Sequence, residues 1–333
     1  MRLSVLVFSR RQGAPGREIA ELDLEIVELG ERIEARLETS AALEAAMPLD
    51  RLRTAFQLEA TEQRCLWLLV AHAISSEVRA LAGGGDGVPL ELLDEAVYAS
   101  PALRDRFARE LGSEGRLVRY GLVELLDSQG ARLTRPVRIA ERIVDLAFGV
   151  EGLAADVARF AALEDPAIVE LLVDPAVRRS VHAALRGHAS GARGAVPLLR
   201  GAEGSGRRAL AGDAARELGA RLLIVRCEDL PVDAMLGGAL VAILREAILE
   251  RAIIVLAGVE ALAEDAATGR RDRTRALDAA LRFYPGPVAL TAGPRLATAL
   301  LPSRGTLIVD LAAPGEGERE RLWARHLGPH ARA

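Results

Sequence analysis

The sequence predicts a mixed α/β protein, in which a mostly helical amino-terminal half is followed by a parallel five-stranded sheet with flanking helices. Three observations support this fold class. Apolar residues recur at helical spacing through much of the first half. The spacing of the apolar residues changes over residues 117–139, where two extended segments flank a polar turn. After residue 195, short β-branched runs alternate with helical stretches, a pattern typical of a parallel sheet.

The composition excludes several classes of function. The chain has 333 residues, a combined Lys and Arg count of 43, an Asp and Glu count of 47, and a formal charge of −4. All of these cations are Arg, and neither Lys nor Asn occurs. No Lys is therefore available for a Schiff base or a phosphate loop. A strongly basic nucleic-acid surface does not fit this net charge.

The apolar runs and the cysteines indicate the compartment. Runs such as residues 252–256 are too short to cross a bilayer, and the first residues lack a secretory signal. Cys65 and Cys227 are predicted to be buried free thiols in a reducing cytoplasm. The His and Cys residues show no metal-ligand spacing, so no metal site is predicted.

Residues 1–46 are predicted to form an amino-terminal strand and a helical arm. An apolar seam at helical spacing runs along residues 17–38 and consists of Ile19, Leu22, Ile26, Leu29 and Ile33. This helix is either a short coiled-coil arm or a helix packed on its own domain. Gly30 and the shortness of the repeat favour the second interpretation.

Residues 47–150 are predicted to form several helices followed by a hairpin, which is the layout of a winged-helix domain. Two helices are expected over residues 48–80, and Thr61 is the expected cap of the second. Extended segments over 117–126 and 132–139, joined by a turn at 127–130, form the hairpin.

The charge of this region bears on DNA binding. A winged-helix domain often contacts DNA through the helix before the hairpin and through the hairpin itself. The cations in those places are Arg104, Arg106, Arg109, Arg116, Arg119, Arg132, Arg135 and Arg138. Residues 86–150 nevertheless hold nine Arg against eleven Asp and Glu. Because DNA binding requires uncompensated cations, a protein-contact or scaffold role is favoured over nucleic-acid binding.

Residues 151–190 are predicted to be a helical connector. Helices are expected within 153–187, starting at Asp165-Pro166 and at Asp174-Pro175. The small and polar residues 187–194 are expected to form a linker to the last domain, over residues 191–333.

The start of this last domain carries a phosphate-loop pattern. An apolar strand at 196–200 is followed by a Gly-rich loop, a helix from residue 209 to 218 and a second strand at 222–225. Glycines let backbone N–H groups turn toward a phosphate, and the helix N-terminus adds its dipole. The candidate phosphate-binding residues are Gly201, Gly204, Ser205, Gly206, Arg207 and Arg208.

Four positions depart from a working phosphate loop. Arg207 stands where the pattern has Lys, and Arg208 stands where a Ser or Thr hydroxyl would coordinate Mg²⁺. The buried strand at 251–256 is followed by Ala257 and Gly258, where carboxylates for metal and water are expected. Glu260 is the nearest carboxylate, and it is expected to cap or solvate the following helix rather than to hold a metal.

Residues 191–327 resemble an AAA+ ATPase domain, with residues 201–208 similar to its Walker A loop and residues 245–262 similar to its Walker B region. The resemblance implies ATP or ADP as ligand, with Mg²⁺ left open. It places Thr291 near the sensor-1 position and makes Arg304 a candidate arginine finger for a neighbouring subunit. With Glu260, these are the candidate catalytic residues. Residues 309–326 resemble the entry to the helical lid, which is expected to be truncated because the chain stops soon afterwards.

Three functions follow as hypotheses. The first is a hydrolysis-deficient pseudo-ATPase that serves assembly or remodelling of a protein complex, in a homo-oligomeric ring or with a second ATPase domain. The second is a weakly active ATPase in which Arg207 contacts phosphate and Glu260 or Asp265 holds the metal. The third is a winged-helix DNA-binding regulator with a degenerate P-loop platform. Protein partners are expected, and membrane contact is not.

Overall fold

A computed structural model describes residues 19–42, 48–98, 101–126, 131–168, 171–189, 194–232, 234–262, 271–296 and 301–327. The predicted amino-terminal strand, the turn at 127–130 and Asp265 lie outside these residues. The chain divides into two compact units, Met1–Glu151 and Gly152–Ala333, which are described separately below as the first unit and the second unit. Within the described residues, no helix combines the length and apolar character needed to cross a bilayer.

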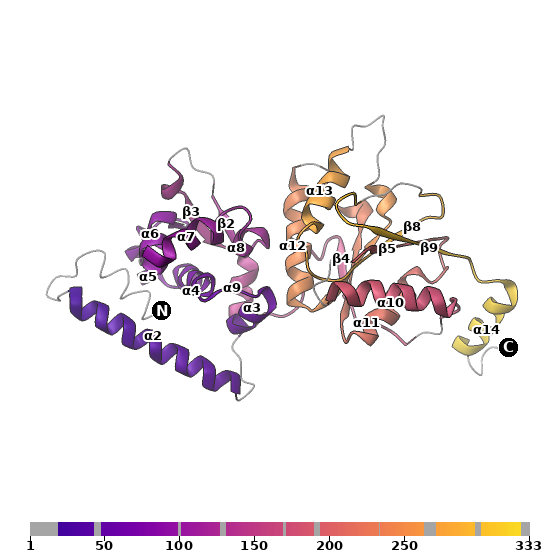
Figure 1. Cartoon of the computed structure of the whole chain (residues 1–333), viewed down its shortest axis with the longest axis horizontal. Helices are drawn as coiled ribbons and strands as arrows, with labels where there is room; N and C mark the ends of the chain where they lie inside the picture. The colour runs from indigo at the N-terminus through magenta and orange to yellow at the C-terminus, as the bar shows by residue number, and fades with distance from the viewer. Residues whose placement is uncertain are drawn as a thin grey trace. The chain divides into compact units, whose positions relative to one another are not determined.

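The first unit combines helices with a small antiparallel sheet (Figure 1). Its helices are α2 (Ile19–Ala42), α3 (Pro48–Phe56), α4 (Ala60–Ile74), α5 (Ser76–Leu81), α6 (Leu90–Val97), α7 (Pro101–Glu110), α8 (Arg116–Arg119) and α9 (Glu141–Ala147). Its strands are β1 (Val88–Pro89), β2 (Val123–Leu125) and β3 (Pro136–Ile139), in the order β1-β3-β2. Helices α6, α7 and α8 thus lie in sequence between β1 and the β2–β3 hairpin.

The core of the first unit forms around α4. This helix is buried along most of its length, so its sequence is apolar on nearly every side. Aromatic contacts hold neighbouring elements, with ring centroids 5.4 Å apart for Phe56–Tyr120 and also for Tyr98–Phe107. The thiol of Cys65 is fully buried against this core, which confirms the predicted buried free cysteine.

Several predictions for the first unit need correction. Residues 48–81 form three helices rather than two, because Ser75 caps α5 by accepting from the Val78 N–H. Thr61 is not the cap of α4. Glu59 is the N-cap and forms a capping box with Glu62, whose carboxylate accepts from the Glu59 N–H at 2.8 Å. The predicted extended segment at 117–126 begins instead with the helical turn α8.

The second unit is built on a six-stranded, mostly parallel sheet (Figure 1). Its strands are β4 (Ala161–Glu164), β5 (Val196–Gly201), β6 (Arg221–Arg226), β7 (Ala252–Ala257), β8 (Val288–Ala292) and β9 (Thr306–Leu311). The order is β4-β6-β7-β8-β5-β9, and only the β4–β6 pair is antiparallel. The five parallel strands are confirmed. The count of five is wrong, because β4 adds a sixth strand at one edge.

Helices cover both faces of this sheet. They are α10 (Pro175–Ala189), α11 (Arg207–Glu217), α12 (Met235–Leu249) and α13 (Arg271–Leu281). Helix α14 (Glu316–Leu327) follows β9 and lies away from the sheet (Figure 1). Side chains of α10 and α11 pack with Leu199, Ile253 and Val255 in one core layer. Because strand side chains alternate between faces, the buried Ile254 and Leu256 point to the other face, where α12 packs on β7.

The connector between residues 153 and 187 is only partly helical. The Asp174-Pro175 start is confirmed, since the Asp174 carboxylate accepts from the Ala176 N–H at the first turn of α10. The Asp165-Pro166 start is wrong. Asp165 instead follows β4, whose residues Ala161–Glu164 pair with β6.

Candidate functional site

The topology of the second unit places a switch point at the carboxyl ends of β5 and β8. These two strands are neighbours, and the chain leaves them in opposite directions along the sheet. From β5 the chain runs through α11 to β6, which lies beyond β8 and β7 in the sheet. From β8 the chain passes to β9, which lies on the other side of β5. Such switch points are where open parallel sheets bind ligands.

The loop of residues 201–206, called here the glycine loop, joins β5 to α11 at this switch point. A Cβ on Gly201 would lie 2.6 Å from the Leu311 carbonyl oxygen and 2.4 Å from Ser205 Oγ, so only glycine fits there. Gly204 and Gly206 have φ angles of +80° and +85°, a left-handed conformation that favours glycine. The sequence therefore specifies the shape of the loop.

The glycine loop leaves polar groups that an anion could use. Helix α11 begins at Arg207 without a side-chain cap, so its first N–H groups have no side-chain acceptor. Ser205 is buried, and its Oγ has no hydrogen-bond partner within the described part of the chain. Together these donors suit the phosphates of a nucleotide.

Both arginines after the loop contact other parts of the second unit. Arg207 Nη1 donates a hydrogen bond to the Ala292 carbonyl oxygen at the end of β8, at 2.5 Å. Arg208 forms an ion pair with Glu164 of β4. A guanidinium has five N–H donors, so Arg207 keeps donors beside the loop after bonding to Ala292.

The end of β7 lacks the side chains that would hold a metal. Ala257 ends the strand, and Gly258 follows with φ +71° and donates its N–H to the Thr291 carbonyl oxygen at 3.0 Å. Neither residue offers a side-chain oxygen. No group of three His, Cys, Asp or Glu residues suited to a metal occurs among the described residues. The residues present therefore fit a phosphate but do not fit Mg²⁺.

Glu260 reaches the same edge of the sheet from the turn after β7. Its Oε1 accepts a hydrogen bond from the Gly293 N–H at 3.1 Å. This contact joins the turn after β7 to the end of β8. The expectation that Glu260 caps or solvates the following helix stays a prediction, because residues 263–270 lie outside the described part of the chain. Thr291 is buried on β8 beside this contact, in register with Leu199 and Ala257. The structure thus brings Glu260 and Thr291 together near the glycine loop.

Arg304 lies at the opposite end of the sheet. The Gly305 carbonyl accepts from the Val196 N–H at the start of β5, whereas the glycine loop leaves the end of that strand. At about 3.3 Å per residue, six strand residues separate these points by roughly 20 Å. Arg304 Nη1 donates to the Leu281 carbonyl oxygen at 3.3 Å. It therefore cannot reach the glycine loop of its own chain.

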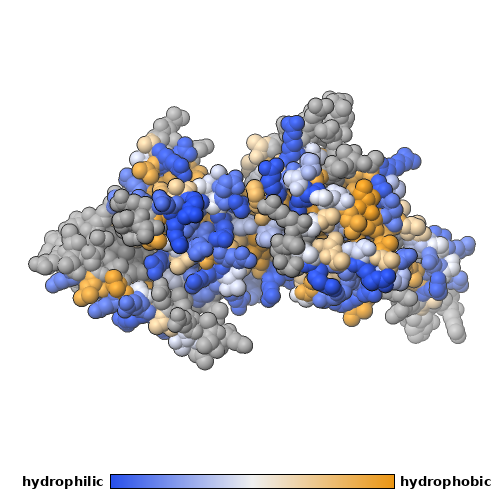
Figure 2. Space-filling view, in the orientation of Figure 1, coloured by the Kyte–Doolittle hydropathy of each residue, from blue (hydrophilic) through white to orange (hydrophobic). Residues whose placement is uncertain are grey.

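In the first unit, carboxylates offset many of the cations proposed for DNA. The pairs and their N–O distances are Arg106–Glu59 at 3.8 Å, Arg116–Glu62 at 3.4 Å, Arg119–Glu114 at 3.2 Å and Arg138–Glu124 at 2.5 Å. Figure 2 shows hydrophilic residues over the part of the first unit where α7 and α8 lie. Since paired cations release fewer counterions from DNA, this arrangement agrees with the charge balance of the sequence.

Two buried polar networks were not predicted. In the first unit, Glu110 Oε2 accepts from the hydroxyls of both Thr61 and Tyr98, at 2.6 and 2.7 Å. In the second, the buried carboxylate of Asp213 bonds to Arg178 and His182. No spacing rule in the sequence points to either network, because each joins residues on different helices.

Both cysteines are buried free thiols, and burial raises the pKa of each. The pKa of Cys65 and that of Cys227 rise to about 12. Both side chains are therefore thiols at neutral pH and poor nucleophiles. Neither cysteine is therefore a candidate for catalysis.

The comparisons with known proteins concern the first unit. Residues 7–161 match the family model described as winged helix domain, variant. The match covers slightly less than half of the chain and extends to the first residue of β4. No curated protein matches the chain. The predicted winged-helix domain is thus supported for these residues.

Proposed function

We propose that this chain is an assembly module whose second unit binds ATP or ADP through the phosphates without metal-dependent hydrolysis. One observation carries the proposal. The glycine loop keeps its shape, while the positions that would supply metal ligands hold Arg208, Ala257 and Gly258. A module of this kind would serve the assembly or remodelling of a protein complex.

The proposed roles of the residues follow from their contacts. The N–H groups at the start of α11 and the remaining donors of Arg207 would hold the phosphates, with Ser205 beneath them. Oε1 of Glu260 accepts from the Gly293 N–H, which gives this carboxylate a structural contact at the end of β8. Phosphoryl transfer depends on metal and positioned charge, and without them the barrier to hydrolysis stays high.

The position of Arg304 supports a role between chains. Because it lies at the opposite end of β5 from the glycine loop, its guanidinium could contact only a nucleotide held by another copy or by a second ATPase domain. A homo-oligomeric ring, or a complex with a second ATPase domain, is therefore the proposed working state.

Calorimetric titration of the full chain with ATP and ADP, in Mg²⁺ and in EDTA, tests the proposal alongside a phosphate-release assay. We expect binding that EDTA does not weaken, with no turnover. Gly206→Val should abolish binding, because a β-branched residue is strained at φ +85°. Gly237→Ala is the matched control, since a Cβ there meets no atom within 4 Å.

Two results would argue against this function. Absence of nucleotide binding in both buffers would leave the glycine loop as a structural element. Mg²⁺-dependent turnover that Gly206→Val removes would instead identify a weakly active ATPase.

A second candidate function is DNA binding by the first unit, which the family match favours. Mobility shifts with random duplex DNA at about 50 mM salt test it, because counterion release is then strong. Binding that falls in Arg109→Ala but not in the ion-paired Arg106→Ala would support a regulator. Absence of a shift at this salt concentration would favour protein partners instead.

A further inference from the structure

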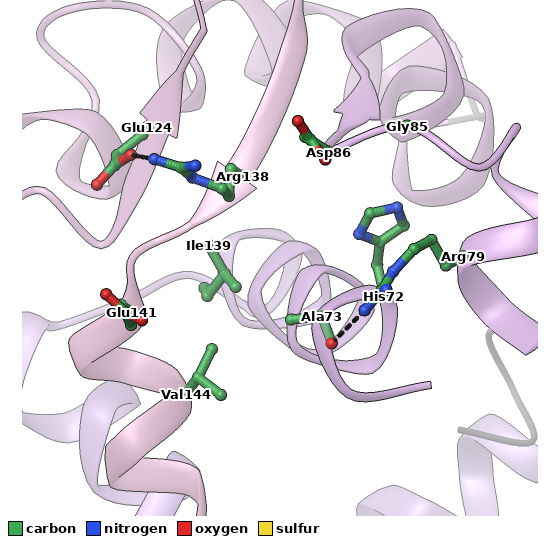
Figure 3. A pocket seen from close by; sticks show the side chains of 10 residues that line it. All are labelled: His72, Ala73, Arg79, Gly85, Asp86, Glu124, Arg138, Ile139, Glu141 and Val144. Atoms are coloured by element: carbon green, nitrogen blue, oxygen red, sulfur yellow. Dashed lines mark hydrogen bonds and ion pairs between the residues drawn. The ribbon is translucent and has the colours of Figure 1, made fainter. Parts of the chain in front are cut away.

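A second candidate site lies in the first unit, away from the glycine loop. It is a groove of about 460 Å³, a size typical of small-ligand sites, bounded by the end of α4, α5, the turn before β1, the β2–β3 hairpin and the start of α9. Figure 3 shows its side chains. The lining residues used below are His72, Arg79, Asp86, Glu124, Arg138 and Glu141.

The floor of the groove contains a buried nitrogen without a partner. His72 is only 5% exposed, and its Nε2 has no hydrogen-bond partner within the described part of the chain. Its ring projects from α4 into the groove, with Ile139 and Val144 nearby as apolar lining (Figure 3). Because buried polar atoms are nearly always satisfied, a nitrogen without a protein partner that faces a groove is a position where a ligand could bind.

Both guanidinium groups of the groove already contact acceptors of the protein. Arg79 Nη2 donates to the Ala73 carbonyl oxygen at 2.7 Å, and Arg138 Nη2 pairs with Glu124 at 2.5 Å (Figure 3). Asp86 and Glu141, in contrast, form no ion pair within the described residues. Glu124 has the largest effect in raising the pKa of Arg138, and Asp86 and Glu141 are near enough to raise it further.

The lining therefore offers a ligand three acceptor groups, beside the N–H donors that Arg79 and Arg138 keep. Burial and the charge of Arg79 keep the pKa of His72 below its usual range, so the imidazole is neutral at pH 7 and can accept a hydrogen bond. The two unpaired carboxylates accept as well. The charged side chains of the lining comprise two cations and three carboxylates, so the groove attracts a cation and repels an anion.

We propose that this groove binds a guanidinium group, with Asp86 and Glu141 as its carboxylate partners and His72 Nε2 as an acceptor at the floor. A guanidinium has five donors and no acceptor, which matches this set of groups. It is also flat and weakly hydrated, so it tolerates the apolar side chains of Ile139 and Val144. The group could belong to a free small molecule or to an arginine side chain presented by a partner protein.

Calorimetric titration of the full chain with two guanidinium probes tests the proposal. Agmatine represents a free ligand, and acetyl-Gly-Arg-Gly-amide represents a presented side chain. The citrulline analogue of the peptide, which has the same shape without the charge, is the ligand control. We expect at least one guanidinium probe to bind saturably, with an affinity at least tenfold higher than that of the citrulline peptide. The probe that binds shows whether the guanidinium belongs to a free ligand or to a presented side chain.

Matched variants link the binding to the groove. The double variant Asp86→Asn, Glu141→Gln should weaken binding at least tenfold and keep the fold, since both side chains are exposed. Asp145→Asn, one turn further along α9 and outside the groove, should bind as the natural chain does. His72→Leu should weaken binding as well, with folding checked by circular dichroism.

Three results would overturn the assignment. One is the absence of saturable binding of both guanidinium probes up to millimolar concentration. Another is that the Asp86→Asn, Glu141→Gln variant binds the guanidinium probes as tightly as the natural chain does. The third is preferential binding of inorganic phosphate, which would make the groove an anion site centred on Arg79 and Arg138.

Discussion

Arg207 Nη1 donates a hydrogen bond to the Ala292 carbonyl oxygen at 2.5 Å, although Arg207 occupies the position of a phosphate-loop Lys. This contact ties the first turn of α11 to the end of β8, beside the glycine loop. The side chain therefore has a structural role that does not depend on a nucleotide.

Arg207→Lys is expected to lower the free energy of unfolding by about 1–2 kcal/mol, because Lys lacks the planar fork that reaches the carbonyl. It should not create ATPase activity, since Arg208, Ala257 and Gly258 remain. Urea unfolding and phosphate release measure the two effects. Arg208→Lys is the control, and its exposed ion pair with Glu164 should change stability by less than about 1 kcal/mol. Metal-dependent turnover in Arg207→Lys would mean that this single Arg blocks catalysis.

Gly201→Ala should destabilise the second unit by about 1–3 kcal/mol, because the added Cβ would overlap the Leu311 carbonyl and Ser205. Main-chain atoms of β9 cannot move without breaking the pairing with β5. Thermal unfolding followed by circular dichroism measures the effect. Gly237→Ala in α12 has open space and should be neutral or slightly stabilising. Equal melting temperatures for the two variants would show that the loop is not packed against β9.

The parallel strands of the second unit could be predicted because each is a continuous apolar run rich in β-branched residues or Leu. Strand β4 could not, since Ala161, Ala162, Leu163 and Glu164 are good helix formers. Pairing with the edge of β6 decides their conformation, as tertiary contacts commonly override propensity.

The candidate site was also predictable in part, because the strand order determines which loops meet. Loops at the carboxyl ends of neighbouring parallel strands must meet, so the glycine loop, Thr291 and Glu260 come together. The donor to Glu260 was not predictable, because the Gly293 N–H is 33 residues away in sequence. His72 carries no motif, and only the fold shows that its Nε2 faces a groove without a partner.

Glu110→Gln should lower the stability of the first unit by about 1–3 kcal/mol. The Glu110 carboxylate accepts two hydroxyl hydrogen bonds in a buried site, and an amide oxygen is a weaker acceptor whose NH₂ group would lack a partner. Chemical unfolding measures the loss. Glu114→Gln, which removes only an exposed ion pair with Arg119, should cost less than about 1 kcal/mol. If Glu110→Gln lowers the free energy of unfolding no more than Glu114→Gln does, the buried network does not stabilise the first unit.

The buried His72 is expected to make the stability of the first unit depend on pH. Burial, and then the charge of Arg79, lower its pKa in the folded chain below 6.5, so between the two pKa values the unfolded chain binds more protons. The stability that the neutral His72 side chain contributes is complete at neutral pH. It is lost as the pH falls from about 6.5 through the lower pKa that His72 has in the folded chain.

Urea unfolding at pH 7.5, 6.5 and 5.5 measures this dependence. His72→Gln should be less sensitive to pH than the natural chain over this range, because glutamine does not titrate. His182→Gln provides the comparison within the second unit, where burial also lowers the pKa of the histidine while Asp213 opposes the shift. An unchanged pH dependence in His72→Gln would mean that folding does not shift the pKa of His72, which would contradict this prediction.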